Sequence, residues 1–308
     1  MKTLALVFSG QGSQAVGMGL SLYNNTQEAQ FLFDKANAIL GFDLKQACFE
    51  GPEETLTQTS YCQPALYVQG YSIYAYLKNK GLLEALGLVF GLSLGELTAL
   101  AAAGVYDFET GLRLVAKRGE LMQKACLEHA GAMVSLLGGD RSLAQELCLA
   151  CDVEMANLNC PGQIVLSGPK ANIEKATEHA KTMSFKRVIP LNVAGAYHSR
   201  LMQSAATEFE RFLKDFDFNP PQIPVLSNTH AKTLQDPKAI KEALVRQIVS
   251  PVLFEDCVTQ AIQQGIDTFY ECGPGAVLCG LIKRTSDQAT SKSLGLYENL
   301  PAPSLATI

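Results

Sequence analysis

The feature that most constrains the fold is a G-x-S-x-G pentapeptide at residues 91–95, set between an apolar run and a helical pattern. This strand–turn–helix context is typical of a nucleophile elbow, a sharp turn that presents a serine at the end of a sheet. Gly91 and Gly95 would let the strand and helix approach closely, because neither residue carries a Cβ atom. The pattern predicts that Ser93 is a nucleophile; a plain structural turn is the alternative.

Two turns are candidates for binding an anion through main-chain N–H groups. The elbow would leave the N–H of Leu94 free at the positive N-terminus of the following helix. The turn at residues 10–15 has the glycine spacing of a dinucleotide fingerprint, but residues 26–33 indicate a helix where the second strand of that motif would lie. We therefore interpret this turn as a second source of main-chain donors.

Strands and helices alternate along most of the chain, which predicts an α/β fold with a mainly parallel sheet covered on both faces. Residues 131–193 instead follow the order β-α-β-β-α-β, which is the ferredoxin-like pattern. The tail from about residue 287 is expected to be loosely ordered. Strands are predicted at 4–8, 87–90, 133–137, 153–158, 163–167, 187–193, 223–226 and 267–270, and helices near 26–40, 63–80, 108–127, 141–150, 170–182, 238–249 and 253–264.

Composition narrows the class of protein. The chain has 308 residues, and its net charge of −5 argues against nucleic acid as a partner. No apolar run approaches the ~20 residues of a membrane span, and the N-terminus indicates a first strand rather than a signal peptide. The nine cysteines are scattered, and the only close pair, Cys148 and Cys151, lies in a helical pattern without a nearby histidine. We interpret them as reduced thiols in a cytoplasmic protein.

A serine nucleophile needs a base, and the chain has four histidines. His129 and His179 lie on exposed helical patterns, and His230 lies in a polar loop. His198 directly follows a predicted strand, where open α/β sheets place their sites. His198 is therefore the candidate base, with a capping or packing role as the alternative.

Arg118 occupies an apolar stripe of the helix predicted at 108–127. A guanidinium in such a stripe is costly unless it meets an anion. Two interpretations are open: a buried ion pair with an internal carboxylate, or a clamp for a substrate carboxylate.

Several motifs occur in this order in malonyl-CoA:acyl carrier protein transacylases, and the chain resembles that family from residue 4 to about residue 285. The motifs are Phe8-Ser9-Gly10-Gln11-Gly12-Ser13-Gln14, Gly91-Leu92-Ser93-Leu94-Gly95-Glu96, Lys117-Arg118-Gly119, Asn157-Leu158-Asn159-Cys160-Pro161-Gly162-Gln163, Gly195-Ala196-Tyr197-His198-Ser199, Val245-Arg246-Gln247 and Glu271-Cys272-Gly273-Pro274-Gly275.

The resemblance implies an α/β-hydrolase-like large domain, residues 1–128 and 196–308, and an inserted ferredoxin-like subdomain, residues 129–195, with the site in the cleft between them. It also implies individual roles, and no acidic third member accompanies the serine and histidine. Ser93 would be the acylated nucleophile, His198 its base, the N–H groups of Gln11 and Leu94 the oxyanion hole, Arg118 the ligand of the malonyl carboxylate, and the main-chain carbonyl of Gln247 the group that orients His198.

The implied reaction moves a malonyl group from malonyl-CoA to the phosphopantetheine thiol of acyl carrier protein, for fatty acid biosynthesis in the cytoplasm. It requires no metal and no bound cofactor, and neither nucleic acid nor membrane takes part. Three alternatives stay open: a serine thioesterase or esterase that uses water, an acyltransferase of polyketide assembly, and a non-catalytic scaffold.

Two positions depart from the family pattern, which has His at residue 92 and often Pro at residue 200. Leu92 is expected to preserve activity, and Arg200 is either a surface change or a contact to phosphopantetheine or carrier. Tyr197 matches the bulky aromatic of malonyl-selective members and should disfavour an α-methyl branch. Basic pairs at 283–284 and 186–187 are candidate docking points for an acidic carrier, or simply solvated surface.

Overall fold

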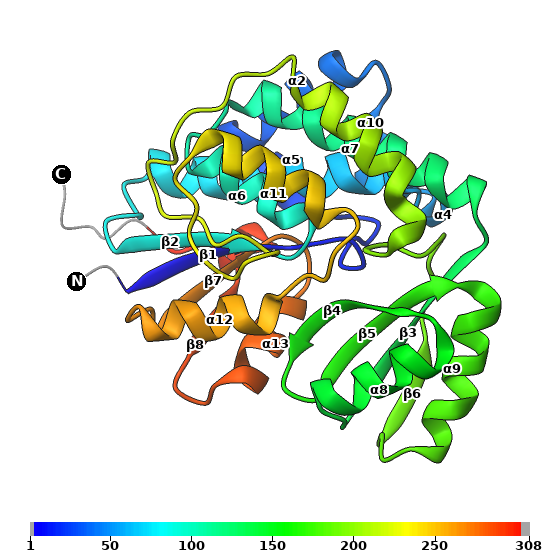
Figure 1. Ribbon diagram of the computed structural model, residues 1–308. Helices are drawn as coiled ribbons and strands as arrows, with labels where there is room; N and C mark the ends of the chain where they lie inside the picture. Colours follow the sequence, from blue (N-terminus) through cyan, green and yellow to red (C-terminus); the bar gives the residue numbers. More distant parts are fainter. Residues whose placement is uncertain (1–2, 303–308) are drawn as a thin grey trace.

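Four parallel strands form the central sheet of the computed structural model, which describes residues 3–302 (Figure 1). Every residue of the inner strand β1 is buried, as expected when helices cover both faces of a sheet. The strand order is β2 (Leu86–Gly91), β1 (Leu4–Phe8), β7 (Thr268–Cys272) and β8 (Thr290–Ser293).

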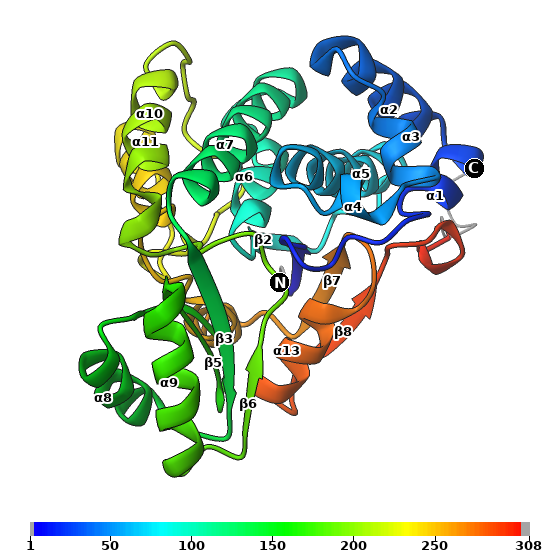
Figure 2. The same cartoon turned by 90° about the vertical axis from the view of Figure 1, so that its right-hand side faces the viewer.

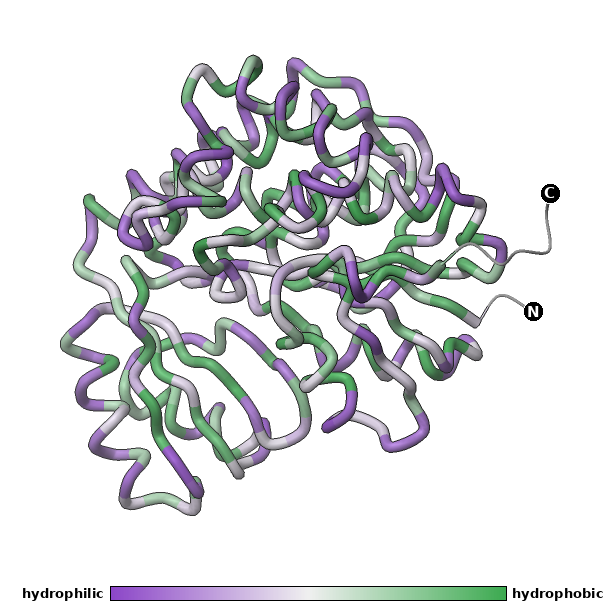
Figure 3. The backbone as a smooth tube through the Cα atoms, turned by 180° about the vertical axis from the view of Figure 1, so that it is seen from behind, coloured by the Kyte–Doolittle hydropathy of each residue, from purple (hydrophilic) through white to green (hydrophobic). Residues whose placement is uncertain are grey.

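The two faces of this sheet build two hydrophobic cores, because successive side chains of β1 point to opposite sides. Leu6 and Phe8 enter the larger core, and Ala5 and Val7 enter the other. The larger core contains α5 (Thr59–Asn79), α6 (Leu94–Ala102) and α7 (Phe108–Glu128), and the smaller one contains α12 (Phe254–Gln263) and α13 (Val277–Thr285). Figure 1 shows these groups above and below the strands, and Figure 3 shows hydrophobic residues gathered along them.

The remaining helices of the large part surround α5 and α7 (Figure 2). α2 packs on α5, and α10 packs on α7 and α11. These elements are α1 (Leu20–Asn25), α2 (Gln27–Leu40), α3 (Leu44–Phe49), α4 (Glu53–Leu56), α10 (Gln203–Leu213), α11 (Pro237–Gln247) and the 3-10 turn η1 (Arg200–Met202).

A second sheet is antiparallel, and its strand order β4-β5-β3-β6 confirms the predicted ferredoxin-like insertion. α8 and α9 pack on one face over their own small core, which includes Cys148 as a buried apolar residue. Met133 and Val165 point from the other face toward the large part. The elements are β3 (Gly131–Leu137), α8 (Arg141–Cys151), β4 (Glu154–Cys160), β5 (Gln163–Pro169), α9 (Lys170–Thr182) and β6 (Arg187–Pro190).

Ion pairs join the small subdomain to the large part on two sides. Arg141 of α8 binds Asp256 of α12 at 2.6 Å. Arg200 binds Asp152 at 2.7 Å and also pairs with Glu154. The departure at residue 200 is therefore a contact between the two parts of the chain.

Two expectations about strands and the tail were wrong. Residues 223–226 form only isolated bridges, because they run beside β2 too briefly to make a ladder. Val225 bridges Val89 of β2, and Leu226 bridges Thr233. The tail expected to be loose contains β8, which pairs with β7, and a 3-10 turn, η2 (Tyr297–Asn299). The short polar stretch of β8 carries no apolar alternation, so only the open edge of β7 reveals it as a strand. Residues 303–308 of that tail lie outside the described residues.

Among residues 3–302, no helix is both long enough and apolar enough to cross a membrane.

Candidate active site

Ser93 lies at the tip of the turn between β2 and α6, in a backbone conformation with φ of 54° that is rare for a residue other than glycine. The flanking glycines make this turn possible. A Cβ atom on Gly91 would collide with the main chain of Gly95, and one on Gly95 would collide with the carbonyl of Phe8. The sharp elbow inferred from the sequence is therefore present, and Ser93 is 7% exposed at the end of the central sheet.

Asn228 holds both sides of this elbow. Its Oδ1 atom accepts a hydrogen bond from the main-chain N–H of Ser93 at 2.7 Å, and its Nδ2 atom donates to the carbonyl of Gly91 at 2.8 Å. The Ser93 side chain makes no capping hydrogen bond to α6. The hydroxyl is consequently available for another partner.

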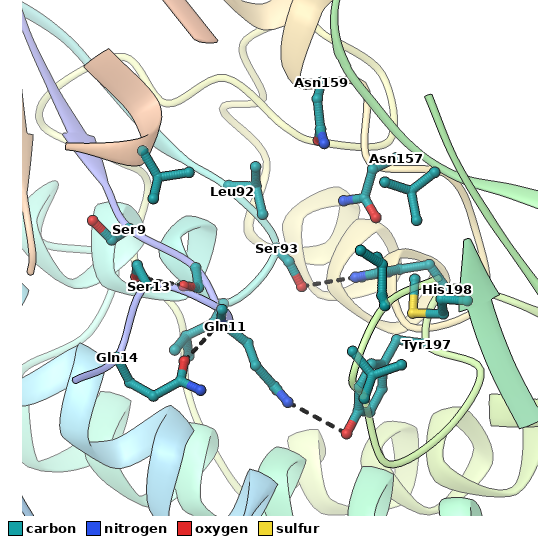
Figure 4. Close-up of a pocket in the computed structure, with 18 of the residues that line it drawn as sticks. Ser9, Gln11, Ser13, Gln14, Leu92, Ser93, Asn157, Asn159, Tyr197 and His198 are labelled. Carbon is teal, nitrogen blue, oxygen red and sulfur yellow. Dashed lines mark hydrogen bonds between the residues drawn. The ribbon is translucent and has the colours of Figure 1, made fainter. Parts of the chain in front are cut away.

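That partner is His198, whose Nε2 atom lies 2.9 Å from Ser93 Oγ (Figure 4). The other ring nitrogen, Nδ1, lies 2.7 Å from the main-chain carbonyl oxygen of Gln247. A carbonyl can only accept, so Nδ1 carries the proton and Nε2 accepts from the serine. Burial, and then the nearby Arg118 charge, lower the pKa of His198 to about 4, which keeps the imidazole neutral near pH 7.

Arg118 meets the same two residues from α7. Its Nη2 atom donates to Ser93 Oγ at 3.1 Å and to Gln247 Oε1 at 2.8 Å, and its Nη1 atom donates to Gln63 Oε1 at 2.9 Å. The side chain is 1% exposed, and burial lowers its pKa to about 10, so the guanidinium stays charged near neutral pH.

The alternative of a buried ion pair is not what the structure contains. Within the described residues, no carboxylate lies at ion-pair distance from Arg118. The Nε atom of Arg118 is buried and has no hydrogen-bond partner among residues 3–302. The direct partners of this side chain are amide and hydroxyl oxygens, so an anion that enters the site can pair with the guanidinium.

The two main-chain groups expected to bind an oxyanion flank Ser93. Leu94 is the first residue of α6, and Gln11 lies in the turn after β1. In residues 3–302, neither N–H donates to another protein group. The Gln11 side chain donates to the hydroxyl of Tyr197 at 3.3 Å (Figure 4). This hydroxyl also lies 2.7 Å from Oγ1 of Thr59.

The serine, the histidine, Arg118 and the two residues expected to bind an oxyanion line a cleft of about 630 Å³ between the large part and the small subdomain. Asn157 and Asn159 face it from β4 (Figure 4), and the Oδ1 atom of Asn159 is buried with no partner in the described residues. Leu92 also lines the cleft and packs against the smaller core. Of the basic pairs, exposed Arg284 borders the cleft; Lys186 and Arg187 are exposed on the small subdomain.

The sequence argument missed Gln63, Glu96 and Asn228, which are all buried around the site. Glu96 follows Ser93 at the S-x-x-E spacing of a helix start, and Asn228 follows an apolar run, so both carried a weak local signal. Gln63 lies within a long helical pattern, and nothing in that pattern indicated a role in the site. Among residues 3–302, no three His, Cys, Asp or Glu side chains gather as a metal site would need.

Comparison with known proteins first gives the class. A family model described as an acyl transferase domain matches residues 5–301, which is nearly the whole chain. A buried serine–histidine pair in a cleft between two subdomains is suited to acyl transfer chemistry.

Similar proteins then narrow the class. The malonyl CoA-acyl carrier protein transacylase of Bacillus subtilis (strain 168) is 40% identical over 291 residues, covering 93% of this chain and 91% of the relative. The crystal structure of an acyl carrier protein S-malonyltransferase from Vibrio cholerae O1 biovar eltor str. N16961 has a TM-score of 0.93 at 39% identity, covering 97% of this chain and 98% of that one. A malonyl-transacylase in complex with its type II PKS acyl-carrier protein has a TM-score of 0.93 at 38% identity, covering 96% and 97%. The chain therefore belongs to the malonyl CoA-acyl carrier protein transacylase family.

Proposed function

We propose that this protein transfers the malonyl group of malonyl-CoA to the phosphopantetheine thiol of an acyl carrier protein, through a malonyl ester on Ser93. The observation that carries the proposal is the hydrogen bond of 2.9 Å between Ser93 and His198, beside a buried Arg118 that has no carboxylate partner in the described residues. We place the reaction in fatty acid biosynthesis and in the cytoplasm. All nine cysteines lie in the described residues and are free, which suits a reducing compartment.

In the first step, Ser93 Oγ attacks the thioester carbonyl while Nε2 of His198 takes the hydroxyl proton. The negative charge that develops on the carbonyl oxygen would be bound by the N–H groups of Gln11 and Leu94. The tetrahedral intermediate collapses, the C–S bond breaks, and CoA leaves as a thiol with the proton from His198. The Gln247 carbonyl would hold the ring in the tautomer that this step requires.

Arg118 would select the acyl group. Its guanidinium lies 3.1 Å from the attacking oxygen. If the acyl group on Ser93 is short and ends in a free carboxylate, that carboxylate can therefore contact the guanidinium. A charge-assisted pair in a buried site favours such a substrate over an uncharged acyl group. Tyr197 lines the same cleft and would crowd an α-methyl branch.

In the second step, the carrier thiol enters the cleft and attacks the ester, with His198 again as base, and Ser93 is released. Asn157 and Asn159 offer amide groups to the amide-bearing phosphopantetheine arm, and the partnerless Oδ1 of Asn159 is suited to an N–H donor there. We assign Asn157 and Asn159 to a subdomain of residues 129–195. We assign Ser93 to a discontinuous domain of residues 1–128 and 196–308.

A water-using thioesterase is the second candidate, since a serine–histidine pair also serves hydrolysis. A generic esterase has no use for a buried cation beside its nucleophile, which favours transfer of a carboxylated acyl group. Transfer in polyketide assembly uses the same chemistry, and it differs only in the carrier that is served.

The test is the intact mass of the protein after brief exposure to malonyl-CoA, for wild type, Ser93→Ala and Ser135→Ala. Ser135 lines the same cleft and serves as the matched control. We expect a malonyl-sized adduct on wild type and Ser135→Ala alone, discharged by holo carrier protein. Steady release of CoA without an adduct would favour the hydrolase, and an adduct on Ser93→Ala would remove Ser93 from its role.

A further inference from the structure

A buried carboxylate lies behind the serine–histidine pair. Glu96 is in the first turn of α6 and is 3% exposed. Its Oε2 atom accepts hydrogen bonds from Nε2 of Gln247 at 2.6 Å and from the main-chain N–H of Asn228 at 3.2 Å. No cation lies within ion-pair distance of Glu96 among residues 3–302, and burying such a group needs a reason.

Gln247 connects this carboxylate to the whole site. Its Oε1 atom accepts from Arg118, and its Nε2 atom donates to Glu96 and to the carbonyl of Ser93. Its main-chain carbonyl accepts from Nδ1 of His198. A single residue therefore separates a buried anion from a buried cation and from the imidazole.

The charges around His198 explain why such an anion matters. When Ser93 attacks, His198 becomes an imidazolium beside the positive guanidinium of Arg118, and like charges in a medium of low polarity repel strongly. Burial and Arg118 both lower the pKa of His198, which makes it a weaker base. A negative charge in the same buried network opposes both effects.

We propose that Glu96 is a positioning residue for acyl transfer, and that its negative charge, acting across the Gln247 side chain, offsets Arg118 and supports proton uptake by His198. This inference rests on the proposed function. Within residues 3–302, no acidic residue contacts the pair directly, and Glu96 supplies that charge one amide away while the guanidinium remains open to the substrate.

The acyl group decides how much this charge is needed. A malonyl carboxylate neutralises Arg118 by itself, whereas an acetyl group leaves the guanidinium unbalanced. Loss of the Glu96 charge should therefore slow acylation from acetyl-CoA more than acylation from malonyl-CoA. A residue that only maintains the fold would affect both substrates equally.

The pH dependence gives a second signature. The titratable groups that face Glu96 are Arg118 on α7, Cys257 on α12 and the buried hydroxyl of Tyr106, and only Arg118 is charged near neutral pH. Burial raises the pKa of Glu96 to about 7, against its hydrogen bonds to Gln247 and Asn228. Glu96 therefore gains its charge as the pH rises through about 7, and acylation should accelerate there, well above the pKa of His198 at about 4.

The experiment measures the acylation rate by rapid quenching with malonyl-CoA and with acetyl-CoA, from about pH 5 to about pH 9. Glu96→Gln retains an oxygen for both donors and removes the charge. We expect it to slow malonyl acylation about tenfold at neutral pH without raising KM, to slow acetyl acylation further, and to abolish the inflection near pH 7. Glu96→Asp retains the charge and should retain the inflection.

Glu271→Gln is the matched control. Glu271 is also buried, but its carboxylate accepts from Ser9 and from the N-terminus of α13, and not from Gln247. This variant should lower stability and retain the inflection. Three results would each overturn the inference. Glu96→Gln could keep wild-type acylation rates and the inflection near pH 7, or it could lose acylation equally with both substrates. Glu96→Asp could lose the inflection. A wild type that forms no acyl adduct would instead overturn the proposed function.

Discussion

The Nη2 atom of Arg118 lies 3.1 Å from the Oγ atom of Ser93, so the selecting cation and the nucleophile are in direct hydrogen-bond contact. A carboxylate bound by this guanidinium must lie within a few bonds of any acyl carbon attached to the serine. This distance therefore fits a short dicarboxylic acyl group. Because the two side chains are in contact, a mutation at Ser93 would change both substrate selection by Arg118 and nucleophilic attack.

Arg118→Ala should lower kcat/KM for malonyl-CoA about a hundredfold or more, because the acyl carboxylate loses the buried guanidinium that pairs with its charge. Transfer of acetyl from acetyl-CoA should be spared or improved. The measurement is kcat/KM for both substrates. Arg113→Ala, on the exposed face of the same helix, should change neither. An equal loss with both substrates would assign Arg118 a structural role.

Asn228→Ala should slow acylation and lower the free energy of unfolding by about 2–4 kcal/mol, because it leaves the N–H of Ser93 and the carbonyl of Gly91 buried without partners. Urea unfolding and single-turnover acylation measure the two effects. Asn172→Ala removes a half-buried asparagine that bonds only to Asp152 among the described residues, far from the elbow in sequence, and should change both quantities much less. Unchanged acylation in Asn228→Ala would show that the elbow holds its shape unaided.

Leu92→His should keep the acylation rate within about threefold of wild type. No side-chain atom of Leu92 makes a hydrogen bond, and Ser93 and His198 are held by other residues. Single-turnover acylation with malonyl-CoA checks this expectation. A much larger gain or loss would assign the side chain at residue 92 a part in shaping the cleft near the nucleophile.

Charge reversal at Lys283 and Arg284 should raise KM for the carrier about tenfold, because both lie in the last turn of α13 and Arg284 borders the cleft. Acylation by malonyl-CoA should change little. The same reversal at Lys186 and Arg187 tests the other candidate surface. If only this second variant raises KM for the carrier, docking belongs to the small subdomain.

Arg200→Ala should lower the free energy of unfolding by about 1 kcal/mol or less, because its ion pairs with Asp152 and Glu154 are partly exposed. KM for the carrier should not change. Thermal unfolding and steady-state kinetics test the two statements. A raised KM for the carrier would indicate that Arg200 contacts the carrier.

Local sequence patterns were sufficient to predict much of the fold and the position of the nucleophile. The elbow was predictable because a strand, a turn and a helix are encoded in consecutive residues, and the two glycines have a steric reason that needs no distant partner. The ferredoxin-like order was predictable for the same reason. The strand β8 was not, because its four polar residues become a strand only through the edge of β7.

The surroundings of Arg118 could not be predicted from its helix. Its apolar stripe required an anion or polar partners, and the partners proved to be Gln63 and Gln247, at sequence distances of 55 and 129 residues. Nothing near residue 118 distinguishes these amides from a carboxylate, so the choice between an ion pair and a substrate clamp depended on the folded chain.

The sequence by itself determined the α/β class, the inserted subdomain, and Ser93, His198 and Arg118 as candidates, because turn chemistry and periodicity are local properties. Tertiary structure alone decided which oxygen each donor meets, where Asn228 and Glu96 lie, and which two amides surround the guanidinium. Hydrogen bonds between distant residues depend on ångström-scale placement of packed elements, and no local pattern of residues records that placement.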